Sequence, residues 1–297
     1  MKFFALLSLS TLTAGLAIKR QTTSTCTDPV VRQEWRSLTE DMRSEYVAAV
    51  QCLTTKDSRL NSTMSLYDDF AYVHRELDTT IHEVSLFFPW HRYFVQTYED
   101  ALRDCGYTGH ATYWDWSLDY SDPFSAPVFN TDSTGFGGDG DATTTCVATG
   151  VLADLTVKVP DTHCLQRSFS ADAFLEYADP VMVNATLAIT MYSLFRPGME
   201  DGPHRSAHGG VRGDMLHNYS PNDPIFFLHH TNVDRLWWTW QQADPDTRLT
   251  EYSGNRYQND ADTEATITDP VPMVGITDDT VVSELMSTET GPFCYTY

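Results

Sequence analysis

Basic side chains are scarce in this chain. Its 297 residues include 19 Lys and Arg against 41 Asp and Glu, which gives a formal net charge of −22 at pH 7. Nucleic acids and anionic membrane surfaces attract basic proteins, so this balance argues against both as partners. Hydrophobic residues make up 41% of the chain, which is enough for a sizeable core. The acidic excess therefore indicates a well-solvated surface around a globular interior.

Long apolar runs are also missing, except near the start of the chain. Residues 1–20, "MKFFALLSLSTLTAGLAIKR", predict a secretory signal peptide, because a basic residue precedes a short apolar run that ends in small residues. The run is too short and too rich in Ser and Thr to span a bilayer. Lys19 and Arg20 then predict a dibasic processing site. Neither an internal repeat nor a linker divides residues 21–297, so we expect one secreted domain.

The cysteines form no C-x-x-C pair, which argues against a structural zinc site. An even number of cysteines in a secreted chain predicts disulfide bonds instead. We expect a local bridge, Cys146–Cys164, and a tie between the two ends, Cys26–Cys294. Sequons for N-glycosylation agree with secretion, and they start at Asn61, Asn184 and Asn218.

Hydrophobic periodicity and helix-end signals predict a mostly α-helical domain with long loops. Asp28-Pro29 is expected to open a first helical segment, and Ser37 with Glu40 matches a capping box for the next helix. Gly, Asp, Ser and Thr are frequent between residues 113 and 150, which predicts long loops. Further helices are predicted near residues 66–77, 90–106, 171–195 and 224–242, the last capped by Asp223, and short strands are predicted within residues 251–297.

Histidine is the most informative residue type. Eight of the ten histidines fall in two clusters along the sequence. His204 and His208 are four residues apart, which places both rings on one face of a helix, as two ligands of one metal ion require. His229 and His230 differ by about 100° around a helix, so only one of them can face that ion. The other should lie behind it, bonded to the backbone or to a carboxylate.

The other cluster supplies three more imidazoles, from His74, His82 and His91. Together the clusters predict two metal sites with three histidine ligands each. Imidazole suits copper, zinc, iron and nickel. Zinc proteases need H-E-x-x-H, and here Leu86 occupies the second His position; di-iron carboxylate bundles need Glu-x-x-His, and here Thr79 stands where the Glu belongs. Neighbouring sites of three histidines without carboxylates therefore favour copper.

Two stretches carry a specific resemblance, "HRELDTTIHEVSLFFPWHRYF" and "DGPHRSAHGG" followed by "NDPIFFLHHTNVDRLWWTWQ". The spacing His82-x8-His91, "PWHR" and the pattern DPxFxxHHxxVDRxW resemble the copper-binding regions of the tyrosinase and catechol oxidase (polyphenol oxidase) family. Over roughly residues 26–242 the chain is similar to short secreted fungal members of these type-3 dicopper proteins. The resemblance implies a central four-helix bundle that holds two copper ions, with long loops and few short strands around it.

Carried over residue by residue, the resemblance implies six copper ligands. His229 then becomes a supporting residue behind the second site. Asp234 and Asp223 are candidates to orient a ligand ring, and an ion pair of Asp234 with Arg92 or Arg235 is the alternative. The implied ligands are His74, His82 and His91 for the first copper, and His204, His208 and His230 for the second.

In this family the copper pair uses O2 to oxidise catechols to o-quinones, so small phenols and O2 are the implied partners. Many tyrosinases have Asn after the first ligand of the second copper, where this chain has Arg205, and Glu eight or nine residues before it, where this chain has Arg196 and Phe195. Both residue types are associated with monophenol hydroxylation. We therefore expect oxidation of catechols or o-aminophenols, with weak or absent monophenol hydroxylation. Gly209 should leave the entrance open, and His217 and Phe195 are candidates to line the pocket.

Two more features set this chain apart from many fungal members. Thr80 stands where they have a Cys that is cross-linked to the second ligand of the first copper, so His82 should be held less rigidly. Only about 55 residues follow Gln242, which is too few for a separate C-terminal lid domain. A true tyrosinase and a hemocyanin-like O2 carrier remain the alternatives. A flat apolar slot for the phenol would draw on Phe87, Phe88, Trp90, Phe226 and Phe227, most of which are expected to pack in the core.

Overall fold

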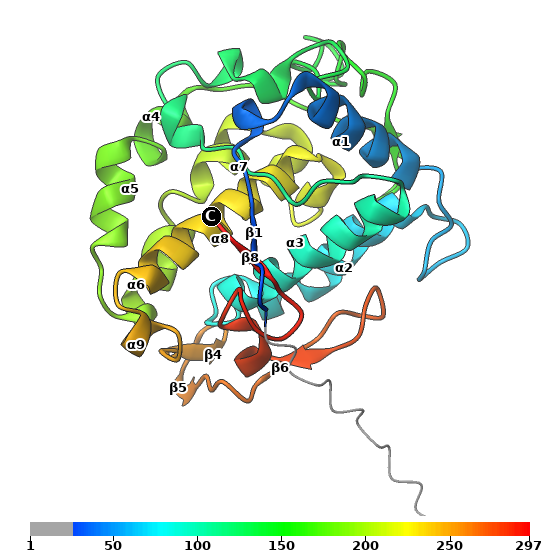
Figure 1. Ribbon diagram of the computed structural model, residues 1–297. Helices are drawn as coiled ribbons and strands as arrows, with labels where there is room; N and C mark the ends of the chain where they lie inside the picture. Colours follow the sequence, from blue (N-terminus) through cyan, green and yellow to red (C-terminus); the bar gives the residue numbers. More distant parts are fainter. Residues whose placement is uncertain (1–25) are drawn as a thin grey trace, which may run out of the picture.

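The computed structural model describes residues 26–297, which form a mainly helical domain with few short strands (Figure 1). The predicted signal peptide and processing site lie outside the described residues. The α-helices are α1 Glu40–Leu53, α2 Leu66–Ile81, α3 Phe87–Asp104, α4 Asp172–Tyr177, α5 Pro180–Leu187, α6 Tyr192–Glu200, α7 Arg205–Val211, α8 Ile225–Gln242 and α9 Pro245–Arg248. The 3-10 helices are η1 Trp35–Ser37, η2 Trp116–Leu118, η3 Pro123–Ser125, η4 Pro127–Phe129, η5 Gly213–Leu216, η6 Ser220–Asn222 and η7 Val282–Leu285.

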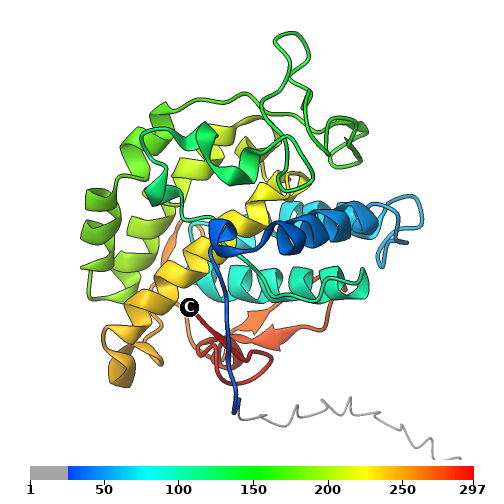
Figure 2. The same ribbon diagram turned by 45° about the horizontal axis from the view of Figure 1, so that its top comes forward.

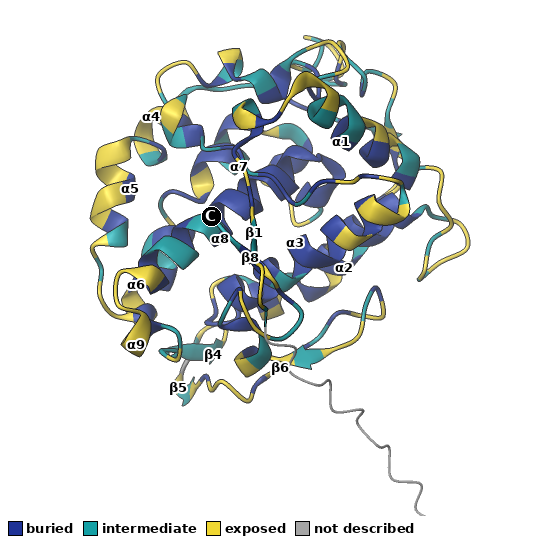
Figure 3. Cartoon of the chain, viewed as in Figure 1, coloured by how far each residue is buried: buried dark blue, intermediate teal, exposed yellow. Residues whose placement is uncertain are grey.

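Four helices at the centre of the molecule, α2, α3, α7 and α8, bring the two histidine clusters together (Figure 1). α3 packs against α8, α2 contacts both α3 and η6, and α7 rests on the short helix α4. Figure 3 shows that α3 and α8 are largely buried, whereas α5 carries many exposed residues on the outer side. The predicted helical fold is confirmed, and the long loops between α3 and α4 cover one end of it (Figure 2).

The ends of the central helices follow from local side-chain contacts. At the start of α2 the Ser65 side chain accepts the Asp68 N–H, while the Asp68 carboxylate accepts the Ser65 N–H at 2.9 Å. α3 ends before Gly106, whose φ of +91° suits glycine, as predicted. At the start of α8 the Asp223 carboxylate accepts the Ile225 N–H at 3.0 Å. Asp223 thus binds a first-turn N–H of α8, as expected, although the cap position is one residue later, at Pro224.

Two predicted helix starts are wrong. The Thr39 side chain, not Ser37, caps α1 by accepting the Met42 N–H at 3.2 Å, because η1 places Ser37 in a separate turn before the helix. Asp28-Pro29 opens no helix, because the residues that follow form β1 and pair in parallel with the end of the chain. Both errors arise because the Ser-x-x-Glu and Asp-Pro motifs, which are typical of helix starts, also occur in turns and extended segments.

The helix predicted at residues 171–195 is divided into α4, α5 and α6. Asp179 interrupts it, since its carboxylate accepts the Val181 N–H at 2.7 Å and Pro180 starts a new helix. α4 packs against α7, and α5 packs against α6 and α8, so these short helices lie on the outside of α7 and α8.

Small sheets and disulfides close the fold. The strands are β1 Val30–Val31, β2 Thr156–Val157, β3 His163–Cys164, β4 Asn255–Tyr257, β5 Asp260–Glu264, β6 Pro270–Val271, β7 Thr280–Val281 and β8 Tyr295–Thr296, and they pair as β1-β8, β2-β3, β4-β5 and β6-β7. Both predicted disulfides, Cys26–Cys294 and Cys146–Cys164, are present, and Cys52–Cys105 joins the ends of α1 and α3. No helix in the described part of the chain has the length and apolar character needed to cross a membrane.

Candidate metal centre

The first histidine cluster converges at the end of α2. His74 lies on α2, His82 directly follows it, and His91 lies on α3, and each offers a ring nitrogen within 4.8 Å of the others. The Nδ1 atoms of His74 and His91 donate to the carbonyl oxygens of Asn218 (2.6 Å) and Phe87 (2.8 Å). A carbonyl oxygen can only accept, so these Nδ1 atoms carry the proton. The two Nε2 atoms, 3.5 Å apart, therefore turn their lone pairs toward a shared space.

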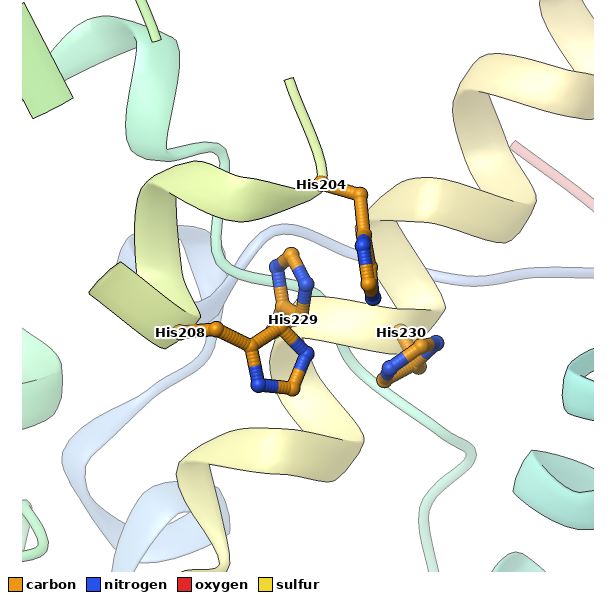
Figure 4. A group of neighbouring side chains, drawn as sticks. All are labelled: His204, His208, His229 and His230. Carbon is orange, nitrogen blue, oxygen red and sulfur yellow. The ribbon is translucent and has the colours of Figure 1, made fainter. Parts of the chain in front are cut away.

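The second cluster brings His204, His208, His229 and His230 within the same limit of 4.8 Å (Figure 4). His204 directly precedes α7 and donates from Nδ1 to the Glu200 carbonyl at 3.1 Å, and His208 donates to the Met215 carbonyl at 2.6 Å. The Nε2 atoms of all four rings, His229 included, are buried and have no hydrogen-bond partner among the described residues. Buried polar atoms rarely go without a partner, so these nitrogens mark a place for a ligand.

His229 and His230 have different surroundings. The indole Nε1–H of Trp116 donates to Nδ1 of His229 at 3.1 Å, so that lone pair is taken and the proton of the neutral ring lies on Nε2. Neither ring nitrogen of His230 has a hydrogen-bond partner within residues 26–297. The ring of His230 also stacks on His91, with centroids 4.2 Å apart and planes inclined by 11°. This stack joins the two clusters into one centre.

Burial keeps the rings neutral. It lowers the pKa of His208 to about 4, and it lowers the pKa of each further buried ring in the two clusters well below the usual range, with the nearby imidazoles acting in the same direction. These further rings are His74, His91, His204, His229 and His230. At neutral pH these six rings are therefore uncharged imidazoles.

A cavity of about 490 Å³ opens onto both clusters. Phe87 and Phe226 do not line the cavity, but both are buried and pack against rings of both clusters. The centroid of Phe87 lies 4.8 Å from His91 and 5.0 Å from His204, and that of Phe226 lies 4.2 Å from His230 and 5.0 Å from His74. The lining residues are His74, Asp78, His82, His204, Arg205, His208, Met215, Leu216, His217, Asn218 and Ser220. A small aromatic molecule that enters this cavity meets histidines of both clusters.

The sequence matches the common central domain of tyrosinase over residues 64–243. The chain belongs to the tyrosinase family. It is 37% identical to "Tyrosinase ustQ" of Aspergillus flavus over 98% of this chain and 87% of that protein. Its structure is similar to a polyphenol oxidase from Thermothelomyces thermophila, with a TM-score of 0.84 and 31% identity over 91% of this chain and 88% of that chain. An octopus hemocyanin functional unit shares the fold, with a TM-score of 0.56 and 23% identity over 75% of this chain and 56% of that chain.

Membership of the tyrosinase family gives this centre its metal and its reaction class. The protein is a copper oxidase with a dinuclear copper centre, and it acts on phenolic substrates with O2 as the oxidant. The donor set agrees with this metal, because neutral imidazoles suit copper and no carboxylate belongs to either cluster of described residues. The unpartnered buried Nε2 atoms of His204, His208 and His230 are positions at which such ions would bind, whereas Nε2 of His229 carries the proton of its ring.

The structure brings two of the four expected pocket residues of this tyrosinase-family chain to the cavity, Arg205 and His217. Phe195 is instead fully buried on the inner face of α6, stacked on Trp240 at a centroid distance of 4.7 Å. Gly209 faces Ala173 of α4, and a Cβ at Gly209 would lie 2.9 Å from the Ala173 Cβ. Phe195 and Gly209 are not among the residues that line this cavity, because counting along the chain does not reveal which side of a helix faces it.

The aspartates expected to orient ligand rings have other partners. Asp234 pairs with Arg92 and accepts from the hydroxyl of Tyr295 at 2.6 Å, so the ion-pair alternative is the one the structure bears out. Asp223 holds Arg167 at 2.7 Å besides capping α8. Arg235 pairs with an aspartate outside α8 rather than with Asp234. No hydrogen bond or ion pair joins Asp234 or Asp223 to a ring of the two clusters of described residues.

One carboxylate at the centre was missed by the sequence analysis. Asp78 lines the cavity, accepts from Nδ1 of His82 at 2.9 Å and from the side-chain amide of Asn218 at 3.3 Å. The hydrogen bond from His82 lowers the pKa of Asp78, so this carboxylate stays ionised. The signal was present, because Asp78 lies four residues before His82 and such residues meet on one helix face.

Proposed function

We propose that this chain is a secreted catechol oxidase that converts o-diphenols or o-aminophenols to o-quinones or quinone imines, with O2 reduced to water. Hydroxylation of monophenols is weak or absent in this proposal. A single domain, residues 21–297, carries the activity after removal of a signal peptide. The first copper is held by His74, His82 and His91, and the second by His204, His208 and His230.

The observation that carries the proposal is the convergence of two imidazole clusters on one cavity. His91 and His230 stack at 4.2 Å, so ions bound to the two clusters would be neighbours. His230 is favoured over His229 as a ligand because Trp116 already occupies the lone pair of His229. His229 then supports the site from behind, between Trp116 and the ring of His204, whose centroid lies 5.2 Å away.

The bound copper pair would exchange electrons with the phenol and with O2. The protein contributes the surroundings. Neutral rings add no negative charge, so the field of the metals at the cavity stays positive and favours a deprotonated phenol. Phe87 and Phe226 pack against the rings of both clusters and keep the surroundings of the metal sites apolar. Leu216 and Met215 extend the apolar lining toward the entrance.

The preference for diphenols is supported by the pairing of the carboxylates near the second cluster, since none of them is placed to accept the proton of a monophenol. Many tyrosinases use Glu and Asn there to help remove the proton of a monophenol, and this chain has Arg205 and no Glu at those positions. Glu200 is buried and bonded to the guanidinium of Arg196 at 2.6 Å. Asp201 is paired with Arg205 at 2.7 Å. Neither acid lines the cavity, so neither replaces the absent Glu.

Metal analysis and a substrate panel test the proposed function. The secreted protein should hold two copper ions per chain and should oxidise catechol and o-aminophenol far faster than monophenols such as tyrosol. Comparable rates on tyrosol would identify a true tyrosinase instead. Reversible O2 binding without turnover of any phenol would identify an oxygen carrier, and a zinc-loaded protein from its native host would refute the copper centre.

A further inference from the structure

The residue after His82 has an unusual backbone. Glu83 has a φ of +58°, in the left-handed region that residues other than glycine seldom adopt. α2 ends at Ile81, and this turn redirects the chain so that the ring of His82 faces the cavity. Such strained residues persist only where surrounding contacts hold them, and they cluster at functional sites. The contacts that hold Glu83 therefore bear on the position of His82.

Both backbone groups of Glu83 are bonded to side chains from distant parts of the chain. Its N–H donates to the Glu200 carboxylate at 2.7 Å, and its carbonyl accepts from the Asn255 amide at 2.7 Å. The guanidinium of Arg196 connects these two side chains, at 2.6 Å from Glu200 and 3.0 Å from the Asn255 amide oxygen. We call Arg196, Glu200 and Asn255 the Glu83 clamp. It joins α6 and β4 to the turn that carries His82.

The C-terminal segment adds further bonds to the same turn. The side-chain amide of Gln258 donates to the His82 carbonyl at 3.0 Å, and the Ser85 N–H donates to the Asn255 carbonyl at 2.9 Å. The hydroxyl of Ser85 donates to the Ser253 carbonyl at 2.8 Å. Residues on both sides of Glu83 are thus tied to residues 253–258. Arg196 and Glu200 are themselves 8% and 6% exposed, so solvent does not compete for their bonds.

We propose that the Glu83 clamp positions His82, so that Arg196, Glu200 and Asn255 are positioning residues for the first copper. This inference rests on the proposed function only in assigning a copper to that site. The chain has Thr80 where many fungal relatives have a cross-linked Cys, and the clamp restrains the turn without a covalent bond. It also explains Arg196, since the arginine that stands in place of a Glu organises the turn instead of acting on the phenol.

The clamp is tested first in the copper-free protein. Asn255→Ala removes the donor to the Glu83 carbonyl, so amide hydrogen exchange of residues 83–86 should quicken by about tenfold, the equivalent of one lost hydrogen bond. Gln258→Ala, at a partly exposed residue, should quicken exchange in the same peptide by less. Asp262→Ala, at an exposed residue on the partner strand β5, is the matched control and should change nothing there. Unaltered exchange at residues 83–86 in both Asn255→Ala and Gln258→Ala would overturn the proposal.

The copper-loaded protein gives the second test. With Asn255→Ala, one of the two coppers should pass to a competing chelator about tenfold faster than in the parent protein. Adding Glu83→Gly should restore much of the retention, because glycine adopts a positive φ without strain and needs the clamp less. No rescue by Glu83→Gly would mean that Asn255 acts on the fold in general, which contradicts the proposal. A parent protein without copper would refute the proposed function, while the exchange experiment would still decide the clamp.

Discussion

At the scale of single residues, the contrast between His229 and His230 shows how a neighbour assigns a role. Ring nitrogens of both lie within 4.8 Å of each other and of His204 and His208, so position alone does not choose between them and one extra contact does. Trp116 supplies that contact for His229, and nothing in residues 26–297 supplies one for His230. A ring nitrogen that already accepts a hydrogen bond is a poor metal ligand, and an unpartnered one in a buried centre is a good one.

His230→Ala should therefore lose one of two copper ions and nearly all oxidase activity. His229→Ala removes a support and not a ligand, so its activity should fall less, by about 10- to 100-fold, with most of the copper kept. Copper content per chain and the rate of catechol oxidation measure both effects. If His230→Ala keeps two coppers while His229→Ala loses one, the ligand assignment is reversed.

Arg205 offers a second test at this scale, because it lines the cavity beside His204. Arg205→Asn restores the residue that many tyrosinases have there, and we expect the rate on tyrosol relative to catechol to rise several-fold. Arg212→Asn, at an exposed residue beyond the end of α7, removes the same charge away from the cavity and should leave that ratio unchanged. A ratio that stays the same in Arg205→Asn would show that Arg205 does not set the preference. Phe195 is unsuitable for such a test, since a Glu there would be buried against Trp240.

The residues that sequence could identify at the site are those with a fixed spacing. Histidines four apart on one helix, and the adjacent pair on another, have relative directions that follow from helix geometry alone. Phe195 and Gly209 do not line the cavity, and whether they could depends on which face of α6 or α7 turns inward. That depends on contacts with Trp240 and Ala173, which lie far away in the sequence. Asp78 was within reach, since its spacing to His82 is also helical.

At the scale of elements, helix starts show the limit of local motifs. Ser37 and Glu40 match a capping box, yet α1 starts after Thr39, because η1 uses the preceding residues for its own turn. The helices with unambiguous signals, α3 before Gly106 and α8 after Asp223, were located well. Local patterns are thus sufficient where one candidate cap exists. Where two compete, packing of the neighbouring turn decides.

Thr39→Ala should lower the free energy of unfolding by about 1 kcal/mol, the usual value of a lost helix cap. The Thr39 hydroxyl accepts the Met42 N–H, which would otherwise lack a partner within the helix. Ser37→Ala is the matched control, because Ser37 is exposed and outside α1, and it should change stability by less than about 0.5 kcal/mol. Urea unfolding of the two variants gives the comparison, and an equal loss in both would favour Ser37 as a partner in the cap.

At the scale of the whole molecule, the two ends of the chain are part of the support for the central helices. Arg32 near the start bonds Glu99 on α3 at 2.8 Å, and Tyr295 near the end bonds Asp234 on α8 at 2.6 Å. The disulfide Cys26–Cys294 fixes both ends beside each other. The sequence suggested only the disulfide, because side-chain bonds between residues so far apart in the chain leave no local pattern. The two terminal segments thus pack on the domain and are bonded to α3 and α8, the helices that carry His91 and His230.

Neutral buried histidines also make the whole molecule sensitive to acid. In the copper-free protein the pKa of His208 falls from about 6.5 in the unfolded chain to about 4, so the unfolded chain binds a proton first as the pH drops. The contribution of this ring to the free energy of unfolding should therefore be fully present above about pH 6.5. It should decrease as the pH falls toward 4, by up to about 3 kcal/mol. Urea midpoints measured across this range test the prediction.

A matched variant separates this effect from the titration of acids. His208→Gln removes the ring's protonation, so its stability should change less between about pH 6.5 and about pH 4.5 than that of the parent protein. Burial alone would raise the pKa of Glu99, but Arg32 and its other partners outweigh burial and lower this pKa to about 2. The contribution of Glu99 to the free energy of unfolding is therefore lost only below about pH 4.5, and the loss is the same in the parent protein and in His208→Gln. Copper should delay the loss in the parent, because a ring that binds a metal ion cannot bind a proton at the same nitrogen. Parallel curves for the copper-free parent and His208→Gln would refute the neutral, buried state of this ring.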